Sequence, residues 1–140
     1  MTFSKDMLQI KEELESANHT VVVPTNVEKY ANGTVTVENK EEKKKFDLIR
    51  GYYEEIKKAD AILVVNKDKI VNSEEEMNNT TIITNYIGGN TLIEIAFAHV
   101  LNKKIFLLNP IPDMSYSDEI NAMNPFVING DLNKIVLNFT

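Results

Sequence analysis

Two short runs in which every residue is apolar, 61–65 and 105–108, constrain the fold of this chain more than any other feature. A strand that is apolar at every position is covered on both faces, which is typical of parallel sheets packed between helices. The β-branched run at 20–24 ends at a proline and predicts another buried strand, and a short strand is expected at 126–128. The sequence therefore predicts a parallel sheet at the centre of the domain.

Helical patterns alternate with these strands along the chain. Apolar residues recur at spacings of three and four over 3–17, which indicates an amphipathic helix. Further helices are expected over 39–58, 92–101, 117–123 and 132–139. This alternation implies right-handed crossovers and helices on both faces of the sheet. We therefore predict an α/β fold, a Rossmann-like or flavodoxin-like three-layer sandwich with four to five parallel strands.

Such a fold normally opens with a strand, whereas this sequence opens with a helix, so the first strand is expected to be missing from the chain. With 140 residues and no internal repeat or linker, the chain is expected to form a single domain over 1–140. The polar stretch 66–85 carries an acidic triplet and is expected to be a long loop, either a lid or disordered.

Composition excludes several classes of function. The chain has no cysteine, which excludes disulfides, thiolate nucleophiles and cysteine-based zinc sites, and its two isolated histidines predict no metal site. The net charge of −6 argues against a nucleic-acid partner. No apolar run approaches the roughly 20 residues of a membrane helix, and the start does not resemble a signal peptide. We therefore expect a cytoplasmic protein without a membrane partner.

A candidate site lies where the predicted strands end, because ligands of such sheets bind beyond the carboxyl ends of the strands. Asn66, the segment 85–91 and Asn109 all lie at such ends. The pair Gly88-Gly89 allows close approach of a ligand or a positive φ. A helix is expected directly after it, and the free N–H groups of that helix favour an anion.

Glu94 is the candidate catalytic residue. It is expected in the first turn of that helix, where the helix dipole would keep it ionised. An ionised, partly desolvated carboxylate suits a nucleophile or a group that stabilises an oxocarbenium ion. The alternative is structural, because Thr91-x-x-Glu94 also has the spacing of a capping box. On spacing alone the capping box is favoured.

Residues 91–98, Thr-Leu-Ile-Glu-Ile-Ala-Phe-Ala, precede a lysine-rich turn and the run at 105–108. This stretch resembles the nucleoside 2-deoxyribosyltransferase superfamily, which includes the 2′-deoxynucleoside 5′-monophosphate N-glycosidases and shows Gly-Thr-x-x-Glu-hydrophobic-Gly/Ala-x-Ala there. Segments 59–65 and 3–24 are also similar, so the resemblance covers most of the chain from residue 3 to about 110. It implies that Glu94 attacks C1′ of deoxyribose and that the chain cleaves or transfers the N-glycosidic bond of a (2′-deoxy)nucleoside or its 5′-monophosphate.

The chain departs from that family at two points. The family often has an aspartate six residues before the glutamate, where this sequence has Gly88, and it opens with a strand and a Gly/Ser turn that helps to hold sugar or phosphate.

The run Gly-Gly-Asn-Thr-Leu-Ile-Glu also resembles the cytokinin-activating phosphoribohydrolases. Their pattern is Gly-Gly-x-Gly-Thr-x-x-Glu, which is one residue longer than the run here. Both families cleave N-glycosidic bonds of nucleotides, a reaction that needs a nearby carboxylate and no metal or cofactor.

The remaining predictions concern binding. The expected substrate contacts are Gly88, Gly89, Asn90, Asn66, Tyr86 and Asn109. Each polar side chain also has a structural alternative: Asn66 in a solvated loop, Asn90 as a helix cap and Tyr86 as a loop anchor. The expected partners are a small nucleoside or nucleotide and a second copy of the chain, in a homodimer or higher homo-oligomer. A catalytically silent nucleotide-binding module of the same fold is the alternative function.

Overall fold

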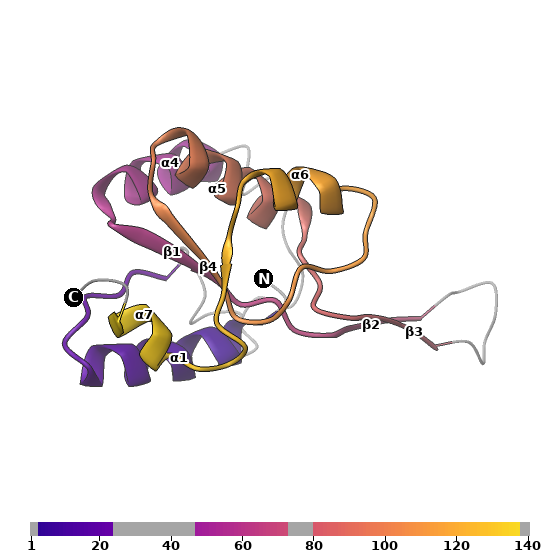
Figure 1. Ribbon diagram of the computed structural model, residues 1–140, viewed down its shortest axis with the longest axis horizontal. Coiled ribbons are helices and arrows are strands. Elements are labelled where there is room, and N and C mark those ends of the chain that lie inside the picture. Colours follow the sequence, from indigo (N-terminus) through magenta and orange to yellow (C-terminus); the bar gives the residue numbers. More distant parts are fainter. Residues whose placement is uncertain (1–2, 24–46, 73–79, 138–140) are drawn as a thin grey trace.

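The computed structural model describes residues 3–23, 47–72 and 80–137 of the chain. Its centre is a parallel sheet of three strands in the order β1 (Ala61–Val64), β4 (Lys104–Leu107) and β5 (Phe126–Val127) (Figure 1). In the register of this sheet Ile62 pairs with Ile105 and Phe106 pairs with Phe126. The prediction of a parallel sheet at these three runs is confirmed, although the described residues supply three strands rather than four or five.

Helices pack on both faces of the sheet because its strands are apolar at every position except Lys104, the exposed first residue of β4. One face meets α4 (Leu48–Lys58), α5 (Gly89–Val100) and α6 (Ser117–Ala122), and the other meets α1 (Ser4–Ser16) and α7 (Asn133–Leu137) (Figure 1). Successive residues of a strand point to opposite faces, so Ile105 and Leu107 belong to one core cluster and Phe106 and Leu108 to the other.

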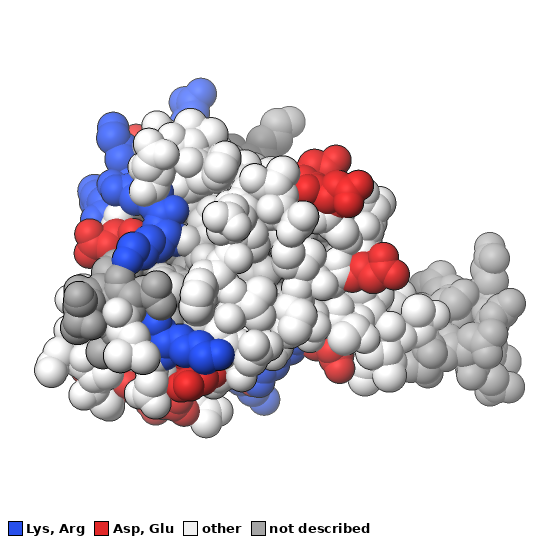
Figure 2. All heavy atoms as spheres, viewed as in Figure 1, with Lys and Arg blue, Asp and Glu red and all other residues white. Residues whose placement is uncertain are grey.

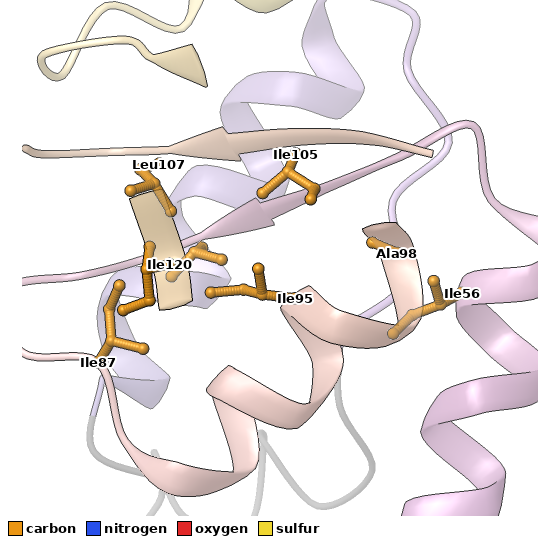
Figure 3. Close-up of a cluster of buried hydrophobic side chains, with 8 residues drawn as sticks. Ile56, Ile87, Ile95, Ala98, Ile105, Leu107 and Ile120 are labelled. Atoms are coloured by element: carbon orange, nitrogen blue, oxygen red, sulfur yellow. The ribbon is translucent and has the colours of Figure 1, made fainter. Parts of the chain in front are cut away.

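The first cluster joins the sheet to α4, α5 and α6 (Figure 3). Its buried residues are Ile56, Val64, Ile87, Ile95, Ala98, Ile105, Leu107 and Ile120. The second cluster joins the sheet to α1 and α7. Its buried residues are Leu14, Val65, Phe106, Leu108, Ile128 and Ile135. Ile87 belongs to the first cluster, so the chain just before Gly88 is anchored in the core.

Asparagine in the left-handed conformation ends several of these helices. Asn18 after α1 has φ 69°, Asn102 after α5 has φ 57° and Asn124 after α6 has φ 53°. The N–H of Lys103 then donates to the carbonyl of Ala98 at 2.8 Å, which closes the last turn of α5. Asparagine tolerates this conformation better than other non-glycine residues, which explains why each helix stops at that point.

Two predicted elements are corrected. The strand expected at 20–24 is not formed over residues 20–23, and residue 24 lies outside the described residues. Val21 packs on the second core cluster but the side chain of Val22 is 66% exposed, so the run is not covered on both sides. The helix expected over 39–58 begins at Leu48, and its expected part over 39–46 lies outside the described residues.

The stretch expected to be a long loop, 66–85, instead contains an antiparallel ribbon. Strands β2 (Lys69–Asn72) and β3 (Thr80–Ile83) pair with Ile70 opposite Ile82, and the ribbon projects from the body of the molecule (Figure 1). Its strands are rich in isoleucine, valine and threonine, which favour a pleated backbone. The polar character of the whole stretch concealed this short β-branched pattern. The acidic triplet lies outside the described residues.

Candidate functional site

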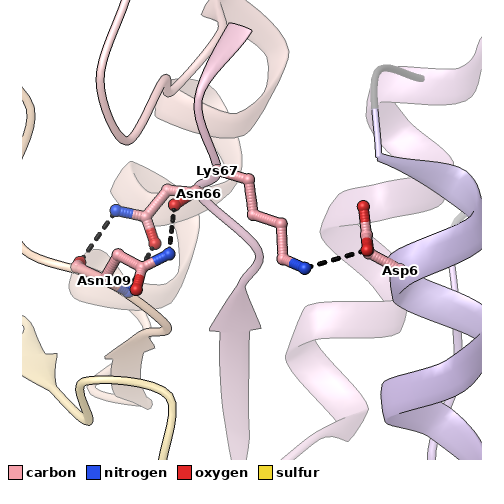
Figure 4. Close-up of polar contacts among 4 residues, drawn as sticks. All are labelled: Asp6, Asn66, Lys67 and Asn109. Atoms are coloured by element: carbon pink, nitrogen blue, oxygen red, sulfur yellow. Dashed lines mark hydrogen bonds and ion pairs between the residues drawn. The ribbon is translucent and has the colours of Figure 1, made fainter.

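Asn66 and Asn109 join the carboxyl ends of β1 and β4 (Figure 4). The Asn66 amide nitrogen donates to the carbonyl oxygens of Asn109 at 2.8 Å and Pro110 at 3.1 Å. Its side-chain oxygen accepts from the Asn109 N–H at 2.9 Å, and the Asn109 amide donates back to the Asn66 carbonyl at 2.8 Å. Asn66 is fully buried rather than in a solvated loop. Because its donors and acceptor are engaged, we expect it to fix this edge of the sheet without touching a ligand.

Hydrogen bonds join residues 67–68, which follow β1, to residues 85–86, which precede α5. The Tyr86 N–H donates to the Lys67 carbonyl at 2.8 Å, and the Asn85 N–H donates to the Asp68 carboxylate at 2.9 Å. The Lys67 ammonium also pairs with Asp6 of α1 at 2.9 Å (Figure 4). The approach to Gly88 is thus tied to the sheet and, through Lys67, to a helix on the opposite face.

Two tyrosines, Tyr86 itself and Tyr116, make contacts at the segment 86–88. The Lys69 ammonium lies 4.5 Å from the centre of the Tyr86 ring, and the Tyr116 hydroxyl donates to the Ile87 carbonyl. Burial and then the neighbouring Tyr86 raise the pKa of Tyr116. A contact of Tyr86 with a substrate stays a prediction. Tyr116 escaped the sequence analysis because it lies in a different segment and no spacing connects it to Gly88.

The glycine pair differs from expectation in one respect. Gly88 has φ −80° and ψ 171°, which other residues also adopt, so a positive φ does not explain it. A Cβ on Gly88 would lie 3.2 Å from the Tyr86 hydroxyl oxygen, whereas a Cβ on Gly89 would meet nothing within 4 Å. The absence of a side chain at Gly88 is therefore explained by the close approach of the Tyr86 ring.

Glu94 lies in the second turn of α5, so the prediction of the first turn is wrong. The helix begins at Gly89, directly after the N-cap Gly88, whose carbonyl accepts from the Leu92 N–H at 2.9 Å. The N-cap makes no side-chain hydrogen bond, and no acidic residue lies in the first turn. The capping-box interpretation of Thr91 and Glu94 is therefore wrong as well. Asn90 is likewise inside the helix rather than at its cap.

The electrostatic expectation for Glu94 is also corrected. Burial raises its pKa from the ordinary 4.5 to about 7. The helix dipole acts mainly within the first turn, so at the second turn loss of water outweighs it. The described residues offer this carboxyl group neither a hydrogen bond nor an ion pair. Glu94 is thus half protonated near neutral pH and lacks a described partner that would compensate its charge.

The contact between α5 and α4 shows which way Glu94 faces. Phe97, three residues further along α5, packs edge-on against Tyr53 of α4 with ring centres 5.2 Å apart. Residues three apart share a helix face, so Glu94 lies on the flank of α5 that is turned toward α4.

Other surface features lie away from this flank. One hollow is lined by Lys103, Lys104 and Phe126 at the start of β4, and another lies between the end of α1 and the turn before α7. Figure 2 shows basic side chains gathered over α4 and the beginning of the sheet, with acidic ones near α6.

The described part of the chain holds no group of three metal-binding side chains. None of its helices is long and apolar enough to cross a membrane.

Comparison of the chain with models of known protein families, with curated proteins and with solved structures finds no match.

Proposed function

We propose that this chain cleaves or transfers the N-glycosidic bond of a (2′-deoxy)nucleoside or its 5′-monophosphate, with Glu94 as the nucleophile. The observation that carries the proposal is the position and state of Glu94. It lies in the second turn of the helix that begins directly after Gly88, it is desolvated enough to raise its pKa to about 7, and no capping role explains it. The resemblance around residues 91–98 supports the same assignment.

The reaction needs a carboxylate at the carbon that becomes positive. As the bond from C1′ to the base nitrogen breaks, the base leaves with the electron pair and takes a proton from solvent, and positive charge develops at C1′. A carboxylate oxygen of Glu94 then bonds to C1′, and water or a second base displaces it and restores the free carboxylate. Charges interact more strongly away from bulk water, so the desolvated carboxylate favours the transition state over the neutral substrate.

The surrounding fold supports this use of Glu94. We assign the chain to the Rossmann-like three-layer sandwiches, in which ligands bind at the carboxyl edge of the sheet. Asn66 and Asn109 hold that edge through backbone and side-chain hydrogen bonds, and the Lys67 carbonyl accepts a hydrogen bond from Tyr86 in the segment 86–88. Tyr86, Gly88 and Gly89 then border the ligand, with Asn90 in the first turn of α5. The remaining expectations, a cytoplasmic protein that forms a homodimer, accompany this proposal.

Base release from a panel of 2′-deoxynucleosides and their 5′-monophosphates tests the proposal. We expect Glu94→Gln to lower the rate at least about a hundredfold, about 3 kcal/mol of transition-state stabilisation, while substrate affinity survives. Glu55→Gln, on the exposed side of α4, is the matched control and should retain the rate. Equal rates for the two variants would overturn the role of Glu94. Binding without any base release from wild-type protein would favour the silent nucleotide-binding module.

A further inference from the structure

Four lysines gather at the edge of the sheet where its strands begin. Lys57 and Lys58 occupy the last turn of α4, and Lys103 and Lys104 lead into β4. The Lys104 N–H donates to the Asp60 carbonyl at 3.3 Å, so the two pairs of lysines lie on neighbouring segments. The described residues give Lys57, Lys58 and Lys103 no ion pair. The Asp60 carboxylate offsets one of the four charges, so this edge stays basic in a chain whose net charge is −6.

The hollow beside these lysines combines positive charge with an exposed aromatic ring. Lys103, Lys104 and Phe126 line it, and we call it the basic hollow. The Phe126 ring packs edge-on against the buried Phe106 with ring centres 6.1 Å apart, yet Phe126 is 47% exposed. In the strand order of the described residues, β5 is an edge strand and no further strand covers it. The basic hollow therefore suits an occupant that carries both acidic and apolar side chains.

The same chain carries such an occupant in the ribbon of β2 and β3. Between the two strands the sequence has three consecutive glutamates at 74–76 followed by Met77, and no lysine or arginine occurs over 70–102. The strands themselves present an apolar pair, because Ile70 lies opposite Ile82 on one face of the ribbon and the two residues are 65% and 58% exposed. An isolated two-stranded ribbon is only marginally stable, so its apolar side favours packing against another surface.

The ribbon and the basic hollow lie at opposite ends of the molecule. Figure 1 shows the ribbon projecting from one end of the long axis, with the starts of β1 and β4 toward the other end. Figure 2 shows basic side chains gathered at that other end. One copy therefore does not bring its own ribbon to its own basic hollow, and two copies are needed to join the complementary surfaces.

We infer that the ribbon of one copy docks on the basic hollow of a second copy. In this contact the glutamates at 74–76 lie against Lys103 and Lys104 of the second copy. The apolar pair of the ribbon covers the exposed Phe126 ring beside those lysines. Because two different surfaces meet, each copy takes part in two such contacts, one through its ribbon and one through its hollow. The inference does not depend on the proposed function.

Sedimentation equilibrium of two charge-reversal variants tests the inference. The ribbon variant carries Glu74→Lys, Glu75→Lys and Glu76→Lys, and the hollow variant carries Lys103→Glu and Lys104→Glu. We expect wild-type protein to self-associate reversibly. The dissociation constant of each variant should rise at least about tenfold, because like charges then face each other across the contact. Raising the sodium chloride concentration from about 50 mM to about 500 mM should also weaken the wild-type association, because salt screens these charges.

An equimolar mixture of the two variants separates a lost contact from a damaged fold. In the mixture the unchanged hollow of the ribbon variant meets the unchanged ribbon of the hollow variant, and the two reversed surfaces also attract each other. The mixture should therefore associate as tightly as wild-type protein. The matched control for the ribbon variant carries Glu12→Lys, Glu13→Lys and Glu54→Lys, which change the net charge equally at exposed helix positions and should leave association unchanged.

The apolar half of the contact is tested in the same assay. Ile70→Ser should weaken the association, whereas Val100→Ser on α5, which is 76% exposed, is the control and should not. Wild-type protein that stays monomeric throughout the concentration range would overturn the inference and leave the basic hollow to a different acidic partner. Association that survives either charge reversal, or a mixture of folded variants that fails to associate, would overturn it as well.

Discussion

Replacing Glu94 by glutamine should stabilise the protein at alkaline pH while abolishing its proposed activity. Glutamine keeps the shape of the side chain and removes the charge that burial disfavours. The pKa of Glu94 is about 7 in the folded protein against 4.5 ordinarily, so the folded state binds the proton more tightly than the unfolded state. The contribution of protonated Glu94 to the free energy of unfolding is therefore fully present below pH 4.5, and it is lost as the pH rises through about 7.

The magnitude follows from the size of that shift. One pKa unit corresponds to about 1.4 kcal/mol, and the shift from 4.5 to about 7 thus amounts to about 3 kcal/mol, of which solvent around the partly exposed side chain screens a part. We expect the free energy of unfolding of Glu94→Gln, relative to wild type, to rise by about 2 kcal/mol between pH 5 and pH 8. Urea unfolding at both pH values measures this difference, and the melting temperature at pH 8 should rise by about 6 °C.

Glu55→Gln controls for the change of net charge, since it removes the same charge from an exposed helix position. Its effect should differ little between the two pH values. A Glu94→Gln effect that is equally flat, or that becomes less favourable as pH rises, would refute the argument, because it would mean that the folded protein does not hold this carboxyl group away from water.

Two further predictions concern the pH dependence of the reaction and the edge of the sheet. If Glu94 acts as the nucleophile, the rate of base release should rise about tenfold from pH 6 and level off above pH 8, with a midpoint near the pKa of about 7; a rate that falls over this interval would identify a proton donor instead. Asn66→Asp should lower the free energy of unfolding by at least about 3 kcal/mol, because a buried carboxylate would face the carbonyl oxygens of Asn109 and Pro110. The exposed Asn121→Asp is the control, and urea midpoints that match for the two variants would contradict the role given to Asn66.

Apolar periodicity predicted the elements whose side chains are buried. The runs at 61–65 and 105–108 are strands because both of their faces meet helices, and their pattern depends on nothing outside the run. The stretch 20–23 has a similar composition but forms no strand, and Val22 is exposed. A strand needs a neighbour for its backbone hydrogen bonds, and a local pattern does not reveal whether one is present.

The sequence suggests where the candidate site lies, but it does not give the electrostatics of that site. Glycines, asparagines and a glutamate near strand ends predict a site at the carboxyl edge of the sheet, and its position there stays a prediction. The helix boundary at Gly89 decided whether Glu94 lies in the first or second turn, and boundaries are the least certain part of any sequence pattern. That difference of one turn reverses the direction of the pKa shift. The closeness of the Tyr86 ring to Gly88 depends on the conformation of the tyrosine side chain, which residue spacing does not encode.

The ribbon of β2 and β3 is closed at its base before it leaves the body of the protein. The bond from Tyr86 to the Lys67 carbonyl and the bond from Asn85 to Asp68 bring the two ends of the ribbon together on the side of the sheet. We therefore expect β2 and β3 to change in length without altering the register of β1 or the start of α5. We therefore expect the ribbon to accept a grafted epitope or fluorescent domain while the core remains intact.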